Sequence, residues 1–327
     1  MRNENNIKMP LQFKAELFFL RCLRFIFKKI YSAPSPINIQ YSNQKASDLI
    51  YEYLKKDKPC MIARFGSGEL GCVVNYLKLA EKNSKNYLRY IRGDDIQFEW
   101  AKNIRDGMER AAGFFPASDE NLVKFSQLML DCIPNADILG SWLSDESYVK
   151  DLMVNAKIIN LSDLEPYYHN NPWTPALEGK AVLVIHPFAE TIKNQYLKRN
   201  KLFKNKDVLP EFNLKIIKAV QSIAYNDCGY QNWFDALDSM KLQITQQEYD
   251  VAIIGCGAYG FPLASFVKEQ GKKAVHLGGA TQILFGIKGA RWDEHEFISK
   301  LYNEYWVRPN EKETPINNKN VENGCYW

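Results

Sequence analysis

The sequence predicts an α/β protein with a Rossmann-like, mostly parallel, doubly wound sheet, preceded by an N-terminal amphipathic helix. Short apolar runs alternate with longer amphipathic stretches along most of the chain, which is the pattern of repeated strand–helix–strand units. Two of these runs lead directly into glycine-containing loops that open a helix, as parallel strands do beside a ligand. The sequence shows no internal repeat.

The individual elements follow from the periodicity of apolar residues. The expected strands lie at 60–65, 137–139, 157–161, 181–186, 214–220, 250–254 and 273–277. The expected helices lie at 45–54, 69–79, 97–112, 119–132, 232–246 and 261–270. Asp119 is the expected N-cap of the fourth of these helices, because its side chain can accept a hydrogen bond from a free backbone N–H group.

Composition narrows the class of protein. A chain of 327 residues can form one large domain or two closely packed halves. Its net charge of +4 is too small to indicate nucleic-acid binding but is compatible with an anionic substrate. Seven cysteines without a C-x-x-C pair favour free thiols in the cytoplasm, and the four histidines lack zinc-type spacing. The 13% aromatic content suits either stacking on sugars or bases, or an aromatic-rich core.

Residues 11–31 form the most unusual stretch of the sequence. Charges interrupt every apolar run, so this segment is neither a membrane span nor a signal peptide. On a helical wheel one face is basic, with Lys14, Arg21, Arg24 and Lys28. The opposite face is apolar, with Phe19, Leu23, Ile26, Phe27 and Ile30. Such a helix can lie on an anionic membrane surface, or it can dock on its own domain.

Three segments are expected along the chain. Residues 1–36 form the basic helix and a linker that contains SAPSP, and residues 37–307 form the α/β catalytic domain. Residues 308–327 form a polar, irregular C-terminal tail that ends in Cys-Tyr-Trp.

A glycine loop follows the strand at 250–254. Gly255, Gly257 and Gly260 have the spacing G-x-G-x-x-G. Glycine permits positive φ and close backbone approach, and the following helix offers free N–H groups to a phosphate. We therefore expect this loop, including Tyr259, to bind the nucleotide of a donor; a purely structural tight turn is the alternative. The next strand lacks the acidic residue that would bind the ribose of a nicotinamide dinucleotide.

A second glycine pair, Gly278 and Gly279, follows the strand at 273–277. Two strand ends with glycine loops define a crevice in an open α/β sheet, and ligands bind in such crevices. We expect this pair to contact the donor as well. His276 could orient a ligand there, or it could simply be hydrogen-bonded at the strand end.

Residues 62–70 read IARFGSGEL, and here the chain resembles the GT-D fold glycosyltransferases, whose equivalent segment reads Arg-Phe-Gly-Asp-Gly-Glu. The positions that match are Arg64, Phe65, Gly66, Gly68 and Glu69, whereas Ser67 stands in place of the aspartate. The resemblance is specific over this short motif and extends only in general layout over residues 45–300.

The resemblance implies transfer of a sugar from a nucleotide diphosphate donor, with Gly66, Ser67 and Gly68 beside the donor. The family's Asp-x-Glu pair is associated with the divalent cation that holds the diphosphate. Because serine offers only a neutral hydroxyl, a Mg or Mn site here would be weaker. Three arrangements stay open: Glu69 and the phosphates hold the metal, Glu69 is a base, or Arg64 and nearby cations replace the metal. A further alternative is that Glu69 only complements a helix dipole.

Other polar residues follow expected strands. His186 ends the strand at 181–186, and with Glu190 it could bind the acceptor or act as an acid–base group. Trp142 could be a sugar platform or a buried packing residue. The adjacent Asp94 and Asp95 could bind a metal or an acceptor, or could lie in a solvated turn.

These observations favour a hexosyltransferase that moves a sugar from a nucleotide diphosphate sugar to a carbohydrate or lipid-linked acceptor. Glu69, Arg64 and His186 are its expected catalytic residues, and Arg64 would neutralise charge on the leaving diphosphate. The resemblance suggests bacterial surface-polysaccharide or glycoprotein biosynthesis, in the cytoplasm or on the inner face of the cell membrane. The rivals are a dinucleotide-dependent oxidoreductase and a non-catalytic nucleotide-sugar-binding subunit, which the Ser67 departure would suit.

Overall fold

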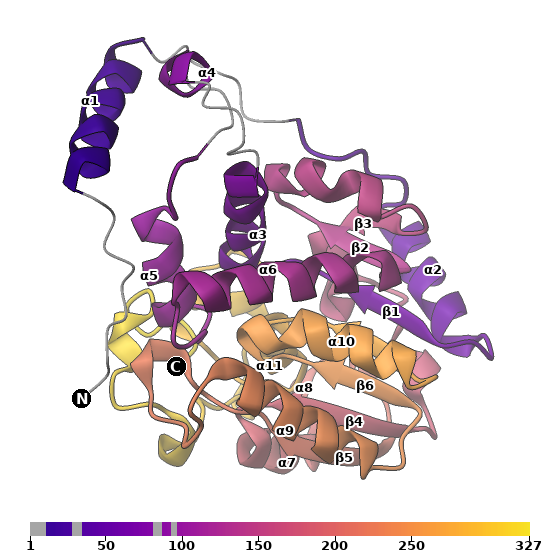
Figure 1. Cartoon of the computed structure of the whole chain (residues 1–327). Coiled ribbons are helices and arrows are strands. Elements are labelled where there is room, and N and C mark those ends of the chain that lie inside the picture. Colours follow the sequence, from indigo (N-terminus) through magenta and orange to yellow (C-terminus); the bar gives the residue numbers. More distant parts are fainter. Residues whose placement is uncertain (1–10, 28–34, 81–86, 93–96) are drawn as a thin grey trace.

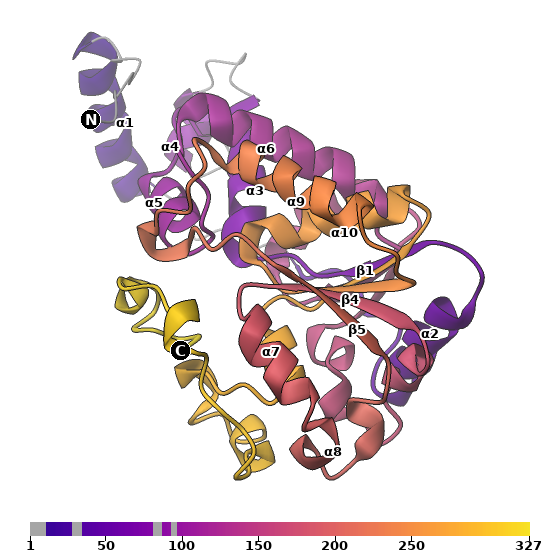
Figure 2. The ribbon, with the colours of Figure 1, turned by 90° about the horizontal axis from the view of Figure 1, so that it is seen from below.

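The chain folds around one parallel sheet with helices on both faces (Figures 1 and 2). The computed structural model describes residues 11–27, 35–80, 87–92 and 97–327. Its seven strands have the order β3-β2-β1-β7-β6-β4-β5, and every neighbouring pair is parallel. The Rossmann-like α/β fold and the helix that precedes it are therefore confirmed.

The strands match the seven expected runs closely. They are β1 (Cys60–Ala63), β2 (Ile138–Ser141), β3 (Lys157–Asn160), β4 (Ala181–His186), β5 (Asn213–Lys218), β6 (Val251–Ile254) and β7 (Lys273–His276). The helices are α1 (Leu11–Phe27), α2 (Gln44–Lys55), α3 (Ser67–Ala80), α4 (Tyr87–Arg92), α5 (Lys102–Arg110), α6 (Asp119–Cys132), α7 (Ala189–Tyr196), α8 (Arg199–Leu202), α9 (Trp233–Thr245), α10 (Gly260–Glu269) and α11 (Ala280–Leu284).

Alternation along each strand builds a hydrophobic core on either side of the sheet. In β1, Met61 and Ala63 face one core, whereas Cys60 and Ile62 face the other. Helices α3, α6, α9 and α10 cover the first face, and α2, α7 and α8 cover the second (Figure 2). Because both faces are buried, the strands read as continuous apolar runs in the sequence.

The connections leave the middle of the sheet in opposite directions. From β1 the chain runs outward to β2 and β3, and from β4 it runs outward to β5 on the other side. Strands β6 and β7 then return to fill the centre. This reversal of strand order leaves a crevice at the carboxyl ends of the central strands, where open α/β sheets bind ligands.

Two α-helices have a side-chain N-cap that the structure identifies. Asn232 caps α9, because its side chain accepts a hydrogen bond from the amide of Asp235. The N-cap of α6 is Ser118 rather than the expected Asp119: the Ser118 hydroxyl accepts from the amide of Asn121. Asp119 is instead the first residue of the helix, where its charge complements the helix dipole.

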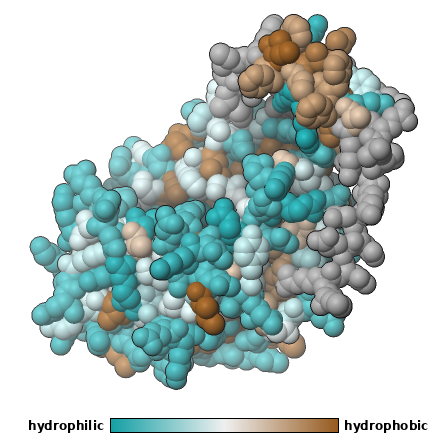
Figure 3. Space-filling model, turned by 90° about the vertical axis from the view of Figure 1, so that its left-hand side faces the viewer, coloured by the Kyte–Doolittle hydropathy of each residue, from teal (hydrophilic) through white to brown (hydrophobic). Residues whose placement is uncertain are grey.

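Helix α1 docks on its own chain through Leu17, Arg21 and Arg24. Leu17 is buried with Tyr90 and Phe98, and Arg24 donates a hydrogen bond to the backbone oxygen of Tyr90 at 2.8 Å. Arg21 forms an ion pair with Glu99. The aromatic side of the helix faces outward and contributes to the hydrophobic patch at the top of Figure 3. In the described part of the chain, no helix combines the length and apolar character needed to cross a bilayer.

The last twenty residues are irregular, as expected, but they pack firmly on the domain. They contain only short 3-10 turns, at Glu311–Glu313 and Asn318–Asn320. The buried carboxylate of Glu313 accepts hydrogen bonds from the backbone amides of Glu190 and Thr191, at 2.7 and 3.2 Å. Because these are free N–H groups at the start of α7, the segment 308–327 caps a helix of the domain.

Candidate active site

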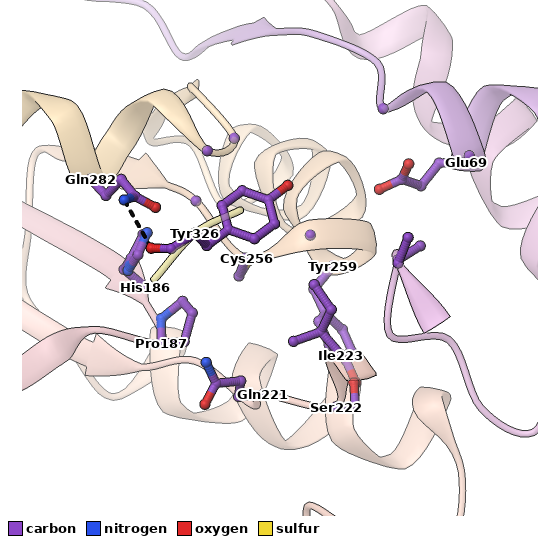
Figure 4. Close-up of a pocket in the computed structure, with 18 of the residues that line it drawn as sticks. Glu69, His186, Pro187, Gln221, Ser222, Ile223, Cys256, Tyr259, Gln282 and Tyr326 are labelled. Atoms are coloured by element: carbon purple, nitrogen blue, oxygen red, sulfur yellow. Dashed lines mark hydrogen bonds between the residues drawn. The ribbon is translucent and has the colours of Figure 1, made fainter. Parts of the chain in front are cut away.

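A cavity of about 520 Å³ lies at the carboxyl ends of β1, β4, β6 and β7 (Figure 4). It has the size typical of sites for small molecules and cofactors. The sequence-predicted residues that line it are Arg64, Gly66, Ser67, Gly68, Glu69, His186, Gly255, Gly257, Tyr259, Gly278 and Gly279. Three motifs that are far apart in the sequence therefore meet at one place.

Arg64 follows β1 directly, and its side chain forms part of the cavity wall beside Gly278 and Gly279. Gly278 has a φ of +61°, and a Cβ there would lie 3.4 Å from the Cδ of Arg64. The guanidinium carbon lies 4.9 Å from the ring centroid of Trp142. Burial lowers the pKa of Arg64 from its ordinary value, and the charge of Glu69 partly offsets this effect. An arginine remains cationic in proteins even so.

No carboxylate in the described residues forms an ion pair with Arg64, and none accepts a hydrogen bond from it. Among the described residues no other acceptor pairs with its guanidinium donors either, and the side chain lines a cavity. A buried cation without a partner is costly, so this arrangement suits a site whose counter-charge arrives with an anionic ligand.

Hydrogen bonds to the backbone amide and the indole N–H fix the position of Trp142 and leave the ring accessible. The carboxylate of buried Glu146 accepts the backbone amides of Trp142 and Leu143, at 3.1 and 3.3 Å, and also the hydroxyl of Ser141. The indole N–H of Trp142 donates to the backbone oxygen of Phe65 at 2.9 Å. The side chain is 46% exposed, so it lines the cavity rather than filling the core.

Glu69 lies in the first turn of α3 and points into the cavity (Figure 4). Its side chain folds back over Gly66, where a Cβ would lie only 2.0 Å from a carboxylate oxygen of Glu69. Burial raises the pKa of Glu69, and its own backbone hydrogen bond and the charge of Arg64 oppose that rise. A carboxylate with a raised pKa that opens to a cavity accepts a proton more readily than an ordinary surface carboxylate does.

Few protein oxygens around Glu69 could bind a divalent cation. Ser67 is exposed and supplies only a hydroxyl. The other carboxylate that lines the cavity belongs to Glu322, which is paired with Arg291 at 2.6 Å. Nowhere among the described residues do three His, Cys, Asp or Glu side chains gather as a metal-binding group. A hard cation needs several oxygen ligands, so a cation bound to Glu69 would take most of them from the phosphates of a donor.

His186 is neutral and can donate a hydrogen bond to a ligand. Its Nδ1 accepts the backbone amide of Phe188 at 3.0 Å, so the ring proton resides on Nε2. Burial lowers the pKa of His186 to about 3. The residue lines the cavity, but an imidazole with this pKa does not take up a proton at neutral pH. Its expected acid–base role is therefore less favourable than binding.

His276 is also buried at the end of its strand. Its Nδ1 lies 3.2 Å from the backbone oxygen of Ile254 and donates to it, which leaves Nε2 as an acceptor. Burial, aided by the charge of Arg64, lowers the pKa of His276 to about 3. The ring packs against Gly260, where a Cβ would lie 2.1 Å from its Cε1.

Each glycine of the first loop, at 255, 257 and 260, is required by local packing or by its backbone conformation. Gly257 has a φ of +55°, and a Cβ on Gly255 would lie 2.5 Å from the hydroxyl of Thr281. Gly260 supports His276 from behind and does not line the cavity. The ring of Tyr259 stacks on that of Trp233, with 4.8 Å between the ring centroids. The hydroxyl of Tyr259 lies 3.0 Å from the Ser222 hydroxyl. Close packing therefore accounts for much of this motif.

Two backbone amides of this loop are open to the cavity. The N–H groups of Cys256 and Gly257 make no hydrogen bond within the described chain, and both residues line the cavity at the 3-10 turn that leads into α10. Free amides at a helix N-terminus can bind a phosphate. The thiol of Cys256 stays protonated because burial raises its pKa.

Sequence reasoning missed one wall of the cavity, which the segment 291–327 supplies. A Cβ on Gly279 would lie 3.1 Å from the ring of Tyr326. The backbone oxygen of Tyr326 accepts from Gln282 at 3.2 Å, and Arg291 lies 4.8 Å from the Tyr326 ring centroid. In Figure 4 the Tyr326 hydroxyl points toward Glu69. The aromatic pair Tyr326-Trp327 after a polar tail was the only available signal.

Two other expected residues do not take part in the cavity. Glu190 is exposed, and only its backbone amide has a described role, at the cap formed by Glu313. Asp94 and Asp95 lie outside the described residues.

Comparison of the chain with protein-family models, with curated proteins and with solved structures found no match.

Proposed function

We propose that the chain is a glycosyltransferase that transfers a hexosyl unit from a nucleotide diphosphate sugar to a carbohydrate or lipid-linked acceptor. The observation that carries the proposal is Arg64, an arginine with no ion-pair partner among the described residues, in a cavity that also holds Glu69 and amides of the Gly257 loop that donate to no described residue. A diphosphate supplies the counter-charge that Arg64 lacks, and arginine binds phosphate through several N–H groups at once.

In the proposed reaction, an acceptor hydroxyl attacks the anomeric carbon of the donor sugar. The bond from that carbon to the diphosphate oxygen breaks, and the nucleoside diphosphate leaves with the electron pair. Glu69 takes the proton of the hydroxyl, and Arg64 stabilises the charge that grows on the diphosphate. His186 donates a hydrogen bond from Nε2 to an oxygen of the bound ligand. A divalent cation would take one ligand from Glu69 and the rest from the donor's phosphates, because no metal-binding group gathers among the described residues.

The rival activities differ in their ligands. A dinucleotide-dependent oxidoreductase needs an acid that binds ribose after the glycine loop, and β7 ends in His276 instead. A non-catalytic subunit would bind the donor without turnover. Support for the proposal therefore comes from the character of the cavity rather than from the glycine spacing.

A thermal-unfolding screen with UDP and GDP sugars, NAD and NADP tests the proposed ligand class. We expect a nucleotide diphosphate sugar to stabilise the protein most, by roughly 2.7 kcal/mol at about 100 times its dissociation constant. Stabilisation by NAD or NADP alone would overturn the proposal. Release of free sugar or of nucleoside diphosphate from the stabilising donor then separates an enzyme from a binding subunit.

A further inference from the structure

The outward face of α1 is an apolar surface that the rest of the described chain leaves uncovered. Its exposed side chains are Phe18, Phe19, Phe25, Ile26 and Phe27. Phe18 is 68% exposed and Phe25 is 90% exposed. The two residues are seven positions apart, so they lie two helical turns apart on the same face. Scattered single apolar residues are normal on a surface, but five on one helix mark an interaction site.

This face is presented rigidly because the other side of the helix is fixed. Leu17 packs with Tyr90 and Phe98, and the Arg24 guanidinium lies 4.5 Å from the ring centroid of Tyr90. Figure 1 shows α1 and α4 projecting from one corner, away from the sheet. The hydrophobic patch at the top of Figure 3 therefore belongs to a projection of the molecule rather than to a groove.

Charge decides what kind of partner covers this face. Between residues 8 and 29 the sequence carries six basic residues and one acidic residue. A second copy of the chain would bring the same excess of positive charge to the interface, which is unfavourable. Anionic phospholipid headgroups attract such a segment, and aromatic side chains favour the boundary between headgroups and acyl chains.

We propose that the aromatic face of α1 inserts into the interface of an anionic phospholipid bilayer and holds the protein on the membrane surface. The arrangement differs from a simple basic anchor, because Arg21 and Arg24 contact the domain and the aromatic side chains face the lipid. Burial of the aromatic side chains in the bilayer supplies most of the affinity for the membrane. The other basic residues between 8 and 29 add an electrostatic attraction that salt weakens. This inference does not depend on the proposed sugar transfer.

The test compares two double variants of the full chain. Phe18→Ser with Phe25→Ser removes two exposed aromatic rings from α1. The matched control is Leu197→Ser with Ile316→Ser, which removes two apolar side chains, 78% and 98% exposed, from other parts of the surface. Because all four residues are exposed, circular dichroism and thermal unfolding should be unchanged in both variants.

Flotation is measured with vesicles of phosphatidylcholine alone and with about 30% phosphatidylglycerol added. We expect the wild-type protein and the control to float with the anionic vesicles. The α1 variant should bind at least about tenfold more weakly, since each buried ring contributes strongly to partitioning. Equal flotation of the α1 variant and the wild type would overturn the proposal. So would a wild-type protein that ignores both vesicles, whether light scattering finds it monomeric or finds a dimer that the α1 variant dissociates.

Discussion

The guanidinium of Arg64 lies 4.9 Å from the ring centroid of Trp142, and this contact joins the end of β1 to the loop after β2. Trp142 is in turn hydrogen-bonded to Phe65 and to Glu146. The stacking fixes the arginine without neutralising it, because an aromatic face attracts a cation but carries no net charge. Arg64 is thus held in place while its donors remain open to a ligand.

Glu69→Gln should separate a chemical role from a structural one. The substitution keeps the shape of the side chain but removes the proton acceptor, so sugar transfer should fall by about 100-fold or more. Stability should change little. If Glu69 only complements the dipole of α3, the change would cost about 0.3–1 kcal/mol of stability and leave turnover intact.

Ser67→Asp is the companion to that experiment, because it restores the acid of the resembling family. A second carboxylate beside Glu69 raises its pKa further, so we expect slower transfer at neutral pH and an optimum at higher pH. The rate is measured across a Mn²⁺ titration. Activation of this variant above the wild-type rate by Mn²⁺ would show instead that Glu69 is a metal ligand.

His186 should make the protein sensitive to acid. Its folded pKa of about 3 lies below the unfolded value of about 6.5, so stability is complete above the unfolded pKa. This contribution of His186 to the free energy of unfolding is lost as pH falls from about 6.5 toward 3, at about 1.4 kcal/mol for each pH unit. His186→Gln removes this effect, and the free energy of unfolding of the variant relative to wild type should rise by about 2 kcal/mol between pH 7 and pH 5. A constant difference between the two proteins would show that His186 is not the buried neutral group described here.

Tyr326 should contribute to ligand binding through its hydroxyl. Burial raises the pKa of Tyr326, so the hydroxyl stays neutral and can donate. Tyr326→Phe should weaken binding of donor or acceptor by about 2–10-fold, which corresponds to one hydrogen bond. Tyr51→Phe, on α2, is the control with an exposed ring. Unchanged KM values for both substrates in Tyr326→Phe would limit this residue to a packing role.

Glu313 tests whether the segment 308–327 is part of the folded unit. Its buried carboxylate accepts two backbone amides and the hydroxyl of Thr191. Glu313→Gln keeps the volume but replaces one acceptor oxygen by a donor, so the free energy of unfolding should fall by about 1–3 kcal/mol. Denaturant unfolding measures the change. A loss below about 0.5 kcal/mol would mean that the cap is not important for stability.

The strands and the meeting of the glycine loops could be predicted because they depend on local periodicity and on the rule that parallel strands end at one edge. Gly255 was found in this way, whereas Arg64 and Glu69 were predicted from the resemblance of residues 62–70 to a family motif. Tyr326 and Glu313 could not be predicted, because their positions depend on how an irregular segment packs on the domain. Such packing leaves no periodic pattern in a sequence.

The tautomer of His186 and the orientation of α1 could not be predicted from the sequence either. From its place at a strand end, His186 was expected to bind the acceptor or to act as an acid–base group, but its tautomer depends on the amide of Phe188. The outward orientation of the α1 aromatics depends on where Leu17 and Arg24 find partners. The helical wheel predicts two faces but does not determine which one meets the domain.

The most direct test of the account is the affinity of wild-type protein and Arg64→Gln for two related ligands, measured by titration calorimetry. One ligand is the nucleotide diphosphate sugar that stabilises the protein most, and the other is its free nucleoside. Arg199→Gln, which removes a cation paired with Glu211, is the control. We predict that Arg64→Gln weakens binding of the diphosphate sugar by about 10–100-fold, as expected for loss of hydrogen bonds to a charged group, and leaves binding of the nucleoside unchanged. Equal affinity of Arg64→Gln and wild type for the diphosphate sugar would contradict the account.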